Sequence, residues 1–320
     1  MSTSIDPPPA PHEPMIPDRV SVSPALEVSK RPNPFKRVGH LWQYRELIGN
    51  LTRKELKVKY KNSILGFIWS LLNPLMYLVV FSLVFNIISA TPVPYYGIFF
   101  LSGLLAWNLF NTALGQGTSA ITSNAQLVTK VWFPREALVL ASVFSALVHF
   151  FLQSIVLLFA LLAFQRSPDY SFLPIFLFAL VVLMLFATAL AVGLSAVNVY
   201  LRDTQHLLEV ALLGWFWLSA VAYPFGLVQT KLEDKWGAGA EWLAGLNPVL
   251  TVVITFQRTL YNPDYSGTST SAVNEANSLP YHPWTWYMTL LGGALAASLV
   301  LLFGSLWLFS KLEDNFAEEI

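Results

Sequence analysis

The feature that most constrains this chain is a long run without charge. From Asn62 to Thr129 the sequence holds no Asp, Glu, Lys or Arg, which makes 68 consecutive uncharged residues. A helix needs only about 20 apolar residues to cross the hydrocarbon core of a bilayer, so this run exceeds a single span. Because 55% of the 320 residues are hydrophobic and only 12% are charged, the sequence predicts a polytopic membrane protein rather than a soluble domain.

The uncharged stretches predict an all-α fold with six transmembrane helices. The segment Ser-Ala-Thr-Pro-Val-Pro at 89–94 divides the first run, and further runs follow it. The predicted spans cover about 63–89, 97–117, 137–164, 172–199, 207–228 and 284–310. A shorter apolar run at 242–257 predicts a re-entrant or interfacial helix between spans five and six. A buried amphipathic helix of an external cap is the alternative, and the sequence does not separate the two.

Two segments precede the first span. Residues 1–35 contain nine of the 20 prolines, which is typical of a disordered cytoplasmic tail. Residues 41–61 combine an apolar helical face with many cations, so they predict an amphipathic helix lying in the membrane interface. The sequence therefore predicts a tail at 1–35 followed by one transmembrane domain at 36–320.

The distribution of cations predicts the orientation. With the N-terminus inside, the cytoplasmic segments hold 15 Lys and Arg residues and the external segments hold four. This bias places both termini in the cytoplasm and makes 229–283 the longest external segment. The N-terminus lacks the pattern of a cleavable signal peptide, so the first span is expected to direct the chain into the plasma membrane.

Several chemistries are missing from the sequence. No G-x-x-x-x-G-K-[ST] motif and no Gly-Lys pair occurs, so this chain is not expected to bind nucleotide itself. The five histidines are scattered and there is no cysteine, so no metal or other cofactor is expected, and no nucleic-acid partner. His149 is the histidine inside a predicted span, where an interhelical hydrogen bond is the favoured role. No carboxylate lies mid-membrane, which argues against ion-coupled transport and embedded acid–base catalysis.

Four stretches, in order along the chain, resemble one family. They are KVKYKNSILGFIW at 57–69 with the following Asn73-Pro74, LVTKVWFPRE at 127–136, NVYLRD at 198–203, and Asn247-Pro248 with Arg258. The pattern resembles the permease subunits of type-2 ABC transporters that export polysaccharides, including O-antigen, capsule and teichoic-acid exporters. The resemblance covers about residues 40–315. The Pro-rich tail lies outside it and looks like an actinobacterial addition, which points toward cell-wall galactan as the exported glycan.

The resemblance implies a partner, an assembly and a gate. Two copies of this chain would form a pore above two copies of a separate ATP-binding subunit, which would hold the ATP and magnesium. The substrate would be a polysaccharide on a polyprenyl diphosphate, moved outward from the cytoplasmic leaflet. The interface helix would gate that leaflet and receive the diphosphate, and retention on anionic lipids is the alternative role of its cations. The predicted gate residues are Arg53, Lys54, Lys57, Lys59 and Tyr60.

The loop at 118–136 is the predicted coupling segment. Pro134 suits the start of a helix, and Glu136 falls in its first turn, where the helix dipole favours a carboxylate. These residues alone fit an ordinary membrane anchor equally well, whereas the resemblance implies contact with the ATPase. The predicted coupling residues are Leu127, Lys130, Trp132, Phe133, Pro134, Arg135 and Glu136, with Arg202 and Asp203 from the loop between spans four and five. For Arg202 and Asp203, a local ion pair at a tight turn or contact with the interface helix is the alternative.

Aromatic side chains, which make up 14% of the chain, predict a path for a glycan. Sugar faces stack on aromatic rings, so such a lining would let a polar polymer slide without binding tightly at one place. Packing against lipid or other helices is the alternative for any one ring. The predicted lining residues are Trp69, Tyr77, Phe81, Phe85, Trp215, Phe216 and Trp217.

Other functions remain open at this point. A type-2 ABC permease for a small lipid or drug would share the fold, and an ATP-independent flippase for a lipid-linked glycan would share the substrate. A membrane-embedded transferase would need an aspartate pair such as DxD near the membrane edge, and the sequence has none.

Overall fold

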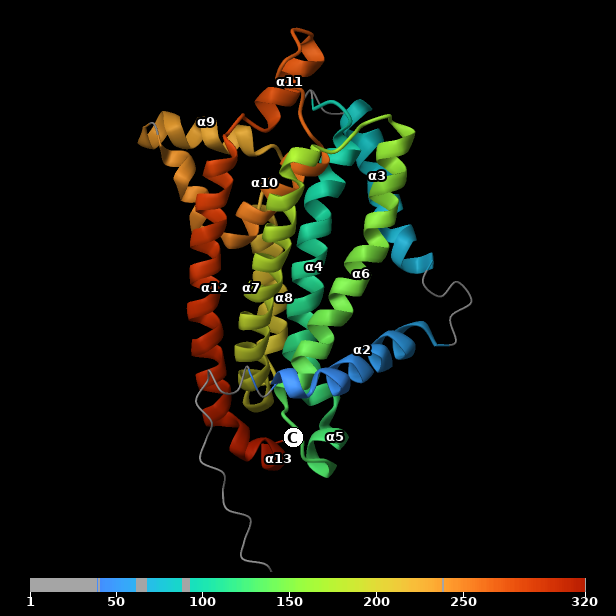
Figure 1. Cartoon of the computed structure of the whole chain (residues 1–320), viewed down its shortest axis with the longest axis vertical. Coiled ribbons are helices and arrows are strands. Elements are labelled where there is room, and N and C mark those ends of the chain that lie inside the picture. The colour runs from blue at the N-terminus through green and yellow to red at the C-terminus, as the bar shows by residue number, and fades with distance from the viewer. Residues whose placement is uncertain (1–38, 40, 62–67, 88–92, 238, 320) are drawn as a thin grey trace, which may run out of the picture.

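The computed structural model describes residues 39, 41–61, 68–87, 93–237 and 239–319, and within them every regular element is a helix (Figure 1). The predicted tail at 1–35 lies outside the described residues, as do both ends of the predicted first span. The α-helices are α2 (Arg45–Tyr60), α3 (Ile68–Ile87), α4 (Tyr96–Ser123), α5 (Ala125–Lys130), α6 (Glu136–Ala163), α7 (Leu173–Tyr200), α8 (Thr204–Leu218), α9 (Phe225–Trp236), α10 (Pro248–Leu260), α11 (Thr270–Ser278), α12 (Trp284–Leu312) and α13 (Phe316–Glu319). Short 3-10 helices are η1 (Tyr170–Phe172), η2 (Ala240–Leu246) and η3 (Glu313–Asn315).

Four helices, α4, α6, α7 and α12, are long and apolar enough to cross a bilayer. Each has 28 or 29 residues, which corresponds to about 42 Å of helix. They run along the long axis of the molecule in Figure 1. The described part of α3 has 20 residues and α8 has 15. The all-helical fold class is thus confirmed, while the count of six spans stays a prediction.

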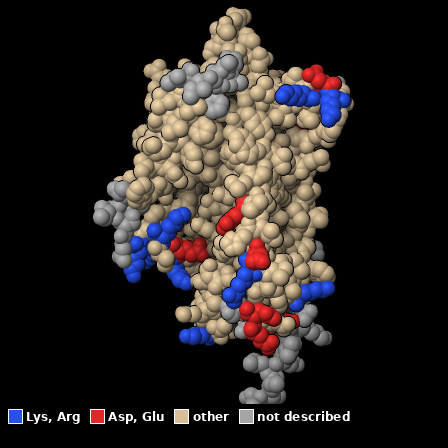
Figure 2. Space-filling model, turned by 180° about the vertical axis from the view of Figure 1, so that it is seen from behind, with Lys and Arg blue, Asp and Glu red and all other residues tan. Residues whose placement is uncertain are grey.

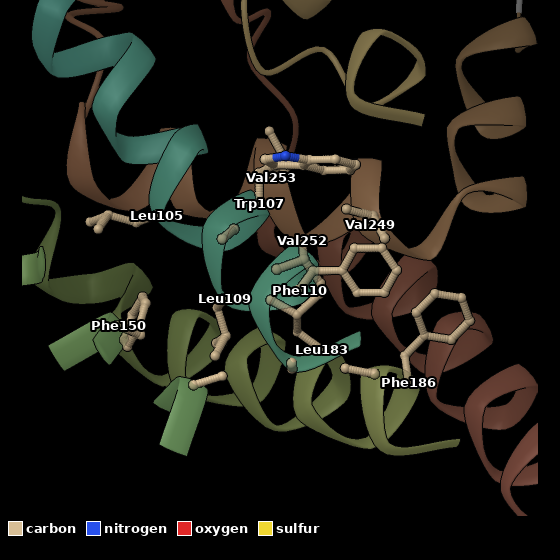
Figure 3. Close-up of a cluster of buried hydrophobic side chains, with 14 of the residues drawn as sticks. Leu105, Trp107, Leu109, Phe110, Phe150, Leu183, Phe186, Val249, Val252 and Val253 are labelled. Atoms are coloured by element: carbon tan, nitrogen blue, oxygen red, sulfur yellow. The ribbon is translucent and has the colours of Figure 1, made fainter. Parts of the chain in front are cut away.

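The bundle is built around α4, which α6, α7 and α10 cover on most sides. Figure 3 shows Phe110 of α4 among side chains of α7 and α10, and its ring lies 5.8 Å from that of Phe186. Small residues bring these helices close together: a Cβ at Gly117 would lie 2.7 Å from the Cβ of Ala191 on α7. Close backbone approach is how helices pack when lipid removes the hydrophobic driving force between them.

The stretch predicted as the fifth span, 207–228, is not one helix. α8 ends at Leu218, and the backbone does not become helical again until α9 begins. Pro224 lacks an N–H and restricts the residue before it, and Ala220 adopts a left-handed φ of 49°. The 15 residues of α8 extend about 22 Å, which is less than the hydrocarbon core of a bilayer. The prediction of one continuous helix here is therefore wrong.

Side chains from distant elements satisfy the non-helical backbone after α8. Asn247 donates from Nδ2 to the last carbonyl of α8 at 3.1 Å, and Gln257 donates from Nε2 to the carbonyl of Ala220 at 3.4 Å. The Tyr96 hydroxyl donates to the carbonyl of Ala222. Irregular backbone at membrane depth is tolerated where protein groups satisfy it in this way. The break is held by tertiary contacts that no local sequence pattern contains.

The apolar run at 242–257 forms η2 and α10. Asn247 caps α10, because its Oδ1 accepts the backbone N–H groups of Val249 and Leu250 at 3.1 and 3.3 Å. Pro248 follows at the first helical position, which suits its missing N–H. From Val249 to Thr259 every side chain of α10 is buried, and the helix packs against α4, α7 and α12. A helix lying in the membrane interface would leave one face exposed. The burial of α10 therefore does not fit an interfacial helix.

The helices α2, α5 and α13 lie toward the end of the molecule opposite α9 and α11 (Figure 1). α2 packs against α6, and α13 contacts both α5 and α7. On the face shown in Figure 2, Lys, Arg, Asp and Glu side chains collect toward this end, with a second group at the far end of the molecule. The band between them carries few charges, as expected for the part of the surface that contacts lipid.

Candidate transport cleft and partner-contact surfaces

A cleft opens between α2, α3, α4, α6 and α8. It consists of two adjoining cavities of about 690 and 450 Å³, which share Lys59, Tyr77, Asn108, Asn111 and Thr112. The face seen in Figure 2 is hollowed above its lower group of Lys and Arg side chains. Aromatic rings, amides and hydroxyls dominate the lining. Other lining residues are Phe100, Leu104, Trp107, Gly115, Gln116, Gln205, Leu208, Glu209, Leu212 and Leu213 in the larger cavity and Tyr60, Ser70, Asn73, His149 and Gln153 in the smaller one.

The part of α4 that faces the cleft is polar toward the C-terminal end of the helix, whereas Phe100, Leu104 and Trp107 line the cleft nearer its start. The C-terminal part lies on one helical face and consists of the polar residues Asn108, Asn111, Thr112 and Gln116, with Gly115 among them. Asn108 donates from Nδ2 to Oε1 of Gln153 on α6 at 3.3 Å, which links two of the cleft walls. We call these five α4 positions the polar stripe.

Sequence reasoning missed the polar stripe because it weighed charges and aromatic residues. The available signal was a set of polar residues at helical spacing inside the long uncharged run. Such residues are unfavourable against lipid, so they indicate a water-filled or protein-lined surface. Only the tertiary structure shows that the neighbouring helices leave this face of α4 open.

The predicted lining residues are divided between the cleft and the core. Trp69, Tyr77, Phe81, Phe216 and Trp217 all line the cleft, from α3 on one side and α8 on the other. The side chain of Phe85 lies outside the described residues.

Trp215 occupies a different place from its two neighbours on α8. Its ring packs 5.1 Å from that of Phe110 and 6.0 Å from that of Phe186 in the core. Its Nε1–H donates to Oδ1 of Asn247 at 2.9 Å. Consecutive residues of a helix point about 100° apart, so three adjacent aromatic residues do not share one wall. The assignment of Trp215 to the cleft lining is therefore corrected.

The predicted gate residues on α2 fall into two groups. Lys59 and Tyr60 line the cleft, whereas Arg53, Lys54 and Lys57 are not among its lining residues. Lys54 donates from Nζ to Oδ1 of Asn124 at 3.0 Å, next to α5. Partial burial lowers the pKa of Lys59 below the usual range of lysine. The structure thus brings one cation of the helix to the cleft and leaves the others outside it.

Polar contacts pin α2 to the bundle. Ser142 of α6 donates to Oε1 of Glu55 at 2.8 Å. Burial raises the pKa of Glu55 above its usual range, and this hydrogen bond only partly opposes the effect. The Tyr60 hydroxyl lies 2.8 Å from Nδ1 of His149 and 2.7 Å from Oγ of Ser70. The predicted interhelical hydrogen bond of His149 is therefore confirmed, and it joins α6 to α2.

The predicted coupling segment forms three parts. α4 continues to Ser123, α5 follows, and a short non-helical stretch leads to α6, which begins at Glu136. The side chain of Trp132 is 86% exposed, which is unusual for a tryptophan in a folded chain. The remaining predicted residues divide by burial: Glu136 is buried; Leu127, Phe133, Pro134 and Arg135 are half-buried; and Lys130 is exposed, as are Arg202 and Asp203 at the α7–α8 turn.

The chain's last helix braces this segment. Arg135 donates to the carbonyl of Glu313, and its guanidinium lies 5.5 Å from the ring centre of Phe316. Phe316 is fully buried, and the Tyr200 hydroxyl donates to the carbonyl of Leu312 at 2.7 Å. These contacts hold the α5–α6 segment and the end of α7 against the C-terminal turns, which run from the end of α12 through η3 to α13.

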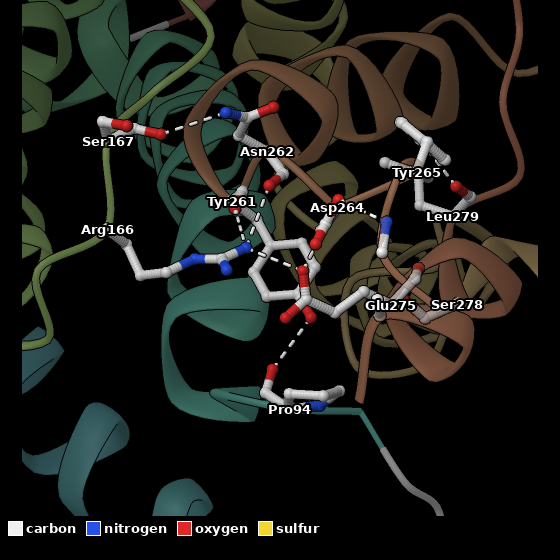
Figure 4. A network of polar contacts seen from close by, with 12 residues as sticks. Pro94, Arg166, Ser167, Tyr261, Asn262, Asp264, Tyr265, Glu275, Ser278 and Leu279 are labelled. Carbon is white, nitrogen blue, oxygen red and sulfur yellow. Dashed lines mark hydrogen bonds and ion pairs between the residues drawn. The ribbon is translucent and has the colours of Figure 1, made fainter. Parts of the chain in front are cut away.

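A polar network closes the other end of the molecule (Figure 4). Arg166 donates from Nη2 to Oε2 of Glu275 at 2.8 Å and to the carbonyl of Asn262 at 2.9 Å. The same Glu275 oxygen accepts the backbone N–H of Asp264 at 2.9 Å. Tyr261 donates to the carbonyl of Pro94 at 2.8 Å. The network joins the loop before α4 to the α6–α7 loop and to the α10–α11 loop.

Arg258, at the end of α10, lies in a second part of this region. It is 5% exposed, its Nη2 lies 2.9 Å from Oδ2 of Asp169, and its guanidinium lies 4.2 Å from the ring centre of Phe172. Burial by itself raises the pKa of Asp169, but the hydrogen bonds from Ser171 and the charge of Arg258 outweigh it, so the pKa lies below its usual range. Burial raises the pKa of Tyr265, whose ring also faces Arg258, to about 12.

Four helices long and apolar enough to cross a bilayer, with a cleft beside two of them that has a polar wall unfavourable against lipid, define a multi-pass membrane transport protein. The chain matches the model of the ABC-2 type transporter family over residues 46–261, and it belongs to that family.

Named relatives agree with this family. The chain is 32% identical over 289 residues to the O-antigen export system permease protein RfbA of Myxococcus xanthus, which covers 89% of this chain and 100% of the relative. It is 24% identical over 276 residues to the O-antigen export system permease protein RfbA of Klebsiella pneumoniae, covering 85% and 94%.

Proposed function

We propose that this chain is the membrane-spanning subunit of an ATP-driven exporter that moves a lipid-linked polysaccharide from the cytoplasmic leaflet across the plasma membrane. The observation that carries the proposal is the similarity, over nearly the whole chain, to permeases named for O-antigen export. The cleft supports it, since aromatic rings beside amides and hydroxyls suit sugar rings and their hydroxyl groups.

The charge pattern and the helix order support the proposed topology. We place the α5 and α13 end in the cytoplasm, together with both termini, and the α9–α11 end outside. α3 and α8 complete the proposed six spans, α8 together with the non-helical residues 219–224 that follow it, and η2 and α10 form the region that enters the membrane and turns back. α2 then lies in the cytoplasmic interface, as its cations favour.

Each exporter would contain two copies of this chain and two copies of an ATP-binding subunit, which would supply the ATP and magnesium site. α3 and α8 expose large apolar side chains outside the cleft, including Leu83, Val210 and Leu218, which suits contact with lipid or with a second copy. Trp132 and the exposed Arg202 and Asp203 would contact the ATPase, since they protrude from the proposed cytoplasmic end.

Lys59 would act at the gate, where it would meet the diphosphate of the carrier at the cytoplasmic end of the cleft. Neutralising Lys57 and Lys59 together, each to Gln, would test the gate. We expect normal membrane insertion and strongly reduced export. Normal export by this double variant would refute the role of these cations.

The whole proposal is tested by depleting the protein in its host and sizing the lipid-linked glycans that remain. We expect full-length lipid-linked polymer to accumulate, and its sugar composition would decide whether it is galactan. If no such glycan accumulates, a permease for a small lipid or drug becomes the better explanation. If no ATPase co-purifies with the chain while glycan still accumulates, an ATP-independent flippase replaces the exporter.

A further inference from the structure

The charge of the cleft lining bears on the chemistry of the glycan. Among the described residues that line either cavity, the charged ones are one cation, Lys59, and one carboxylate, Glu209. The polar remainder of the lining consists of uncharged amides and hydroxyls, with His149 and Tyr60 bonded to each other. A ligand in this cleft therefore meets many neutral hydrogen-bonding groups and almost no net charge.

Two cleft amides, those of Asn111 and Gln116, differ from many other polar side chains in the long helices. Elsewhere a hydroxyl is satisfied within its own helix, as when Thr188 donates to the carbonyl of Met184 at 2.7 Å and Ser298 donates to that of Ala294 at 2.6 Å. The contacts among the described residues give the side-chain amides of Asn111 and Gln116 no such partner. An amide carries two N–H donors and an acceptor oxygen, so each of these side chains is free to bind a ligand.

The arrangement suits the two faces of a sugar. Asn111 and Gln116 offer donors and acceptors from α4, while Tyr77 and Phe216 offer rings from α3 and α8. Hydroxyl groups both donate and accept, as amides do, whereas the apolar face of a sugar ring packs on an aromatic ring. A neutral sugar can thus satisfy both kinds of lining at once.

A polymer with a negative charge in every repeat would be poorly matched. Burying an ionised group without a partner is strongly unfavourable, and Lys59 could pair with only one charge at a time. Glu209, at the larger cavity, would repel such a polymer. We propose that the exported glycan is an uncharged polymer, that Asn111 and Gln116 bind its hydroxyl groups, and that polyanionic glycans are not substrates. This inference rests on the proposed export function and narrows it.

The first experiment examines the glycan trapped by depletion. The polymer is released from its carrier diphosphate by mild acid and applied to an anion-exchange column at neutral pH. We expect it to pass through unretained. A retained polymer overturns the inference and leaves the export function standing. If no lipid-linked glycan is trapped at all, both proposals are overturned.

The second experiment tests the amides in the same host. The double variant N111L/Q116M keeps the side-chain sizes but removes the amides, and T188V serves as a matched control outside the cleft. Removing two neutral hydrogen bonds is expected to lower export about tenfold, with membrane levels unchanged. Wild-type export by the double variant would overturn the role of the amides.

The same variants separate ligand binding from contact between copies, since polar side chains also join helices in membranes. The mass of the purified protein in detergent, measured by light scattering, is expected to be the same for wild type, N111L/Q116M and T188V. A change of mass confined to N111L/Q116M would assign the amides to an interface between copies and overturn their role in glycan binding. The single variant N111L, at an exposed position, is the fallback if the double variant does not accumulate.

Discussion

Replacing Asn247 by alanine should weaken the junction between α8 and α10 more than the loss of a helix cap alone. The Asn247 side chain accepts the backbone N–H groups of Val249 and Leu250 at 3.1 and 3.3 Å. It also accepts the indole N–H of Trp215 at 2.9 Å and donates to the carbonyl of Leu218 at 3.1 Å. One side chain therefore serves as a cap and as a link between two helix ends.

The expected loss can be worked from these contacts. Removing an N-cap costs about 1 kcal/mol. Leaving the Trp215 N–H without a partner in a half-buried site adds about 1–2 kcal/mol, and losing the hydrogen bond to the exposed Leu218 carbonyl adds about 1 kcal/mol. Asn247→Ala should therefore lower the free energy of unfolding by about 3–4 kcal/mol. Asn247→Asp keeps the acceptor oxygen and loses only the donor, so it should lose about 1 kcal/mol.

The measurement is equilibrium unfolding in mixed detergent micelles, followed by tryptophan fluorescence. Ser269 is the matched control, since it caps α11 through one hydrogen bond to the backbone N–H of Ala272 at 3.2 Å and joins no second helix. Ser269→Ala should lose about 1 kcal/mol. If Asn247→Ala and Ser269→Ala lose the same amount, the argument that Asn247 links α8 to α10 is refuted.

Three further predictions follow from single side chains. Trp132→Ala should leave folding unchanged, because the side chain is 86% exposed, but should lower export about tenfold or more in a transport assay with the ATPase. The control Trp236→Ala, at a side chain that is 63% exposed at the other end of the molecule, should not lower export, and equal effects of the two variants would contradict the coupling role. Gly117→Ala should destabilise the fold by about 1–3 kcal/mol, because the new methyl would lie 2.7 Å from a side chain of α7, whereas Gly115→Ala meets nothing within 4 Å; unfolding of the two variants in micelles would show no difference if this packing argument were wrong. The carboxyl of Asp169 has a lowered pKa in the folded protein. The stability that it gains from pairing with Arg258 is therefore fully present above about pH 4 and is lost as the pH falls through the pKa of Asp169 in the folded protein. Asp169→Asn should flatten the acid side of a stability profile between about pH 2 and 5, and an unchanged profile would show that the pairing contributes little.

The sequence by itself determined where the long helices begin and what kind of chain this is. Pro134 and Glu136 precede and open α6, as predicted. The run at 242–257, by contrast, divides into η2 and α10, which Asn247 and Pro248 open. Long apolar runs gave the crossing helices α6, α7 and α12 to within a few residues, because helix length in a bilayer is a property of the run itself. The family could likewise be recognised from short stretches of sequence.

The tertiary structure decided what the sequence could not, because those features depend on residues far apart in the chain. α8 stops at Leu218 because Asn247 and Gln257 satisfy the backbone beyond it, so an apolar run that looked like a span is divided. Trp215 enters the core while Trp217, two residues later, lines the cleft, since helix rotation and neighbouring helices select the direction. Periodicity shows that a helix has distinct faces, but only packing decides which face of α4 stays open and becomes the polar wall of a cleft.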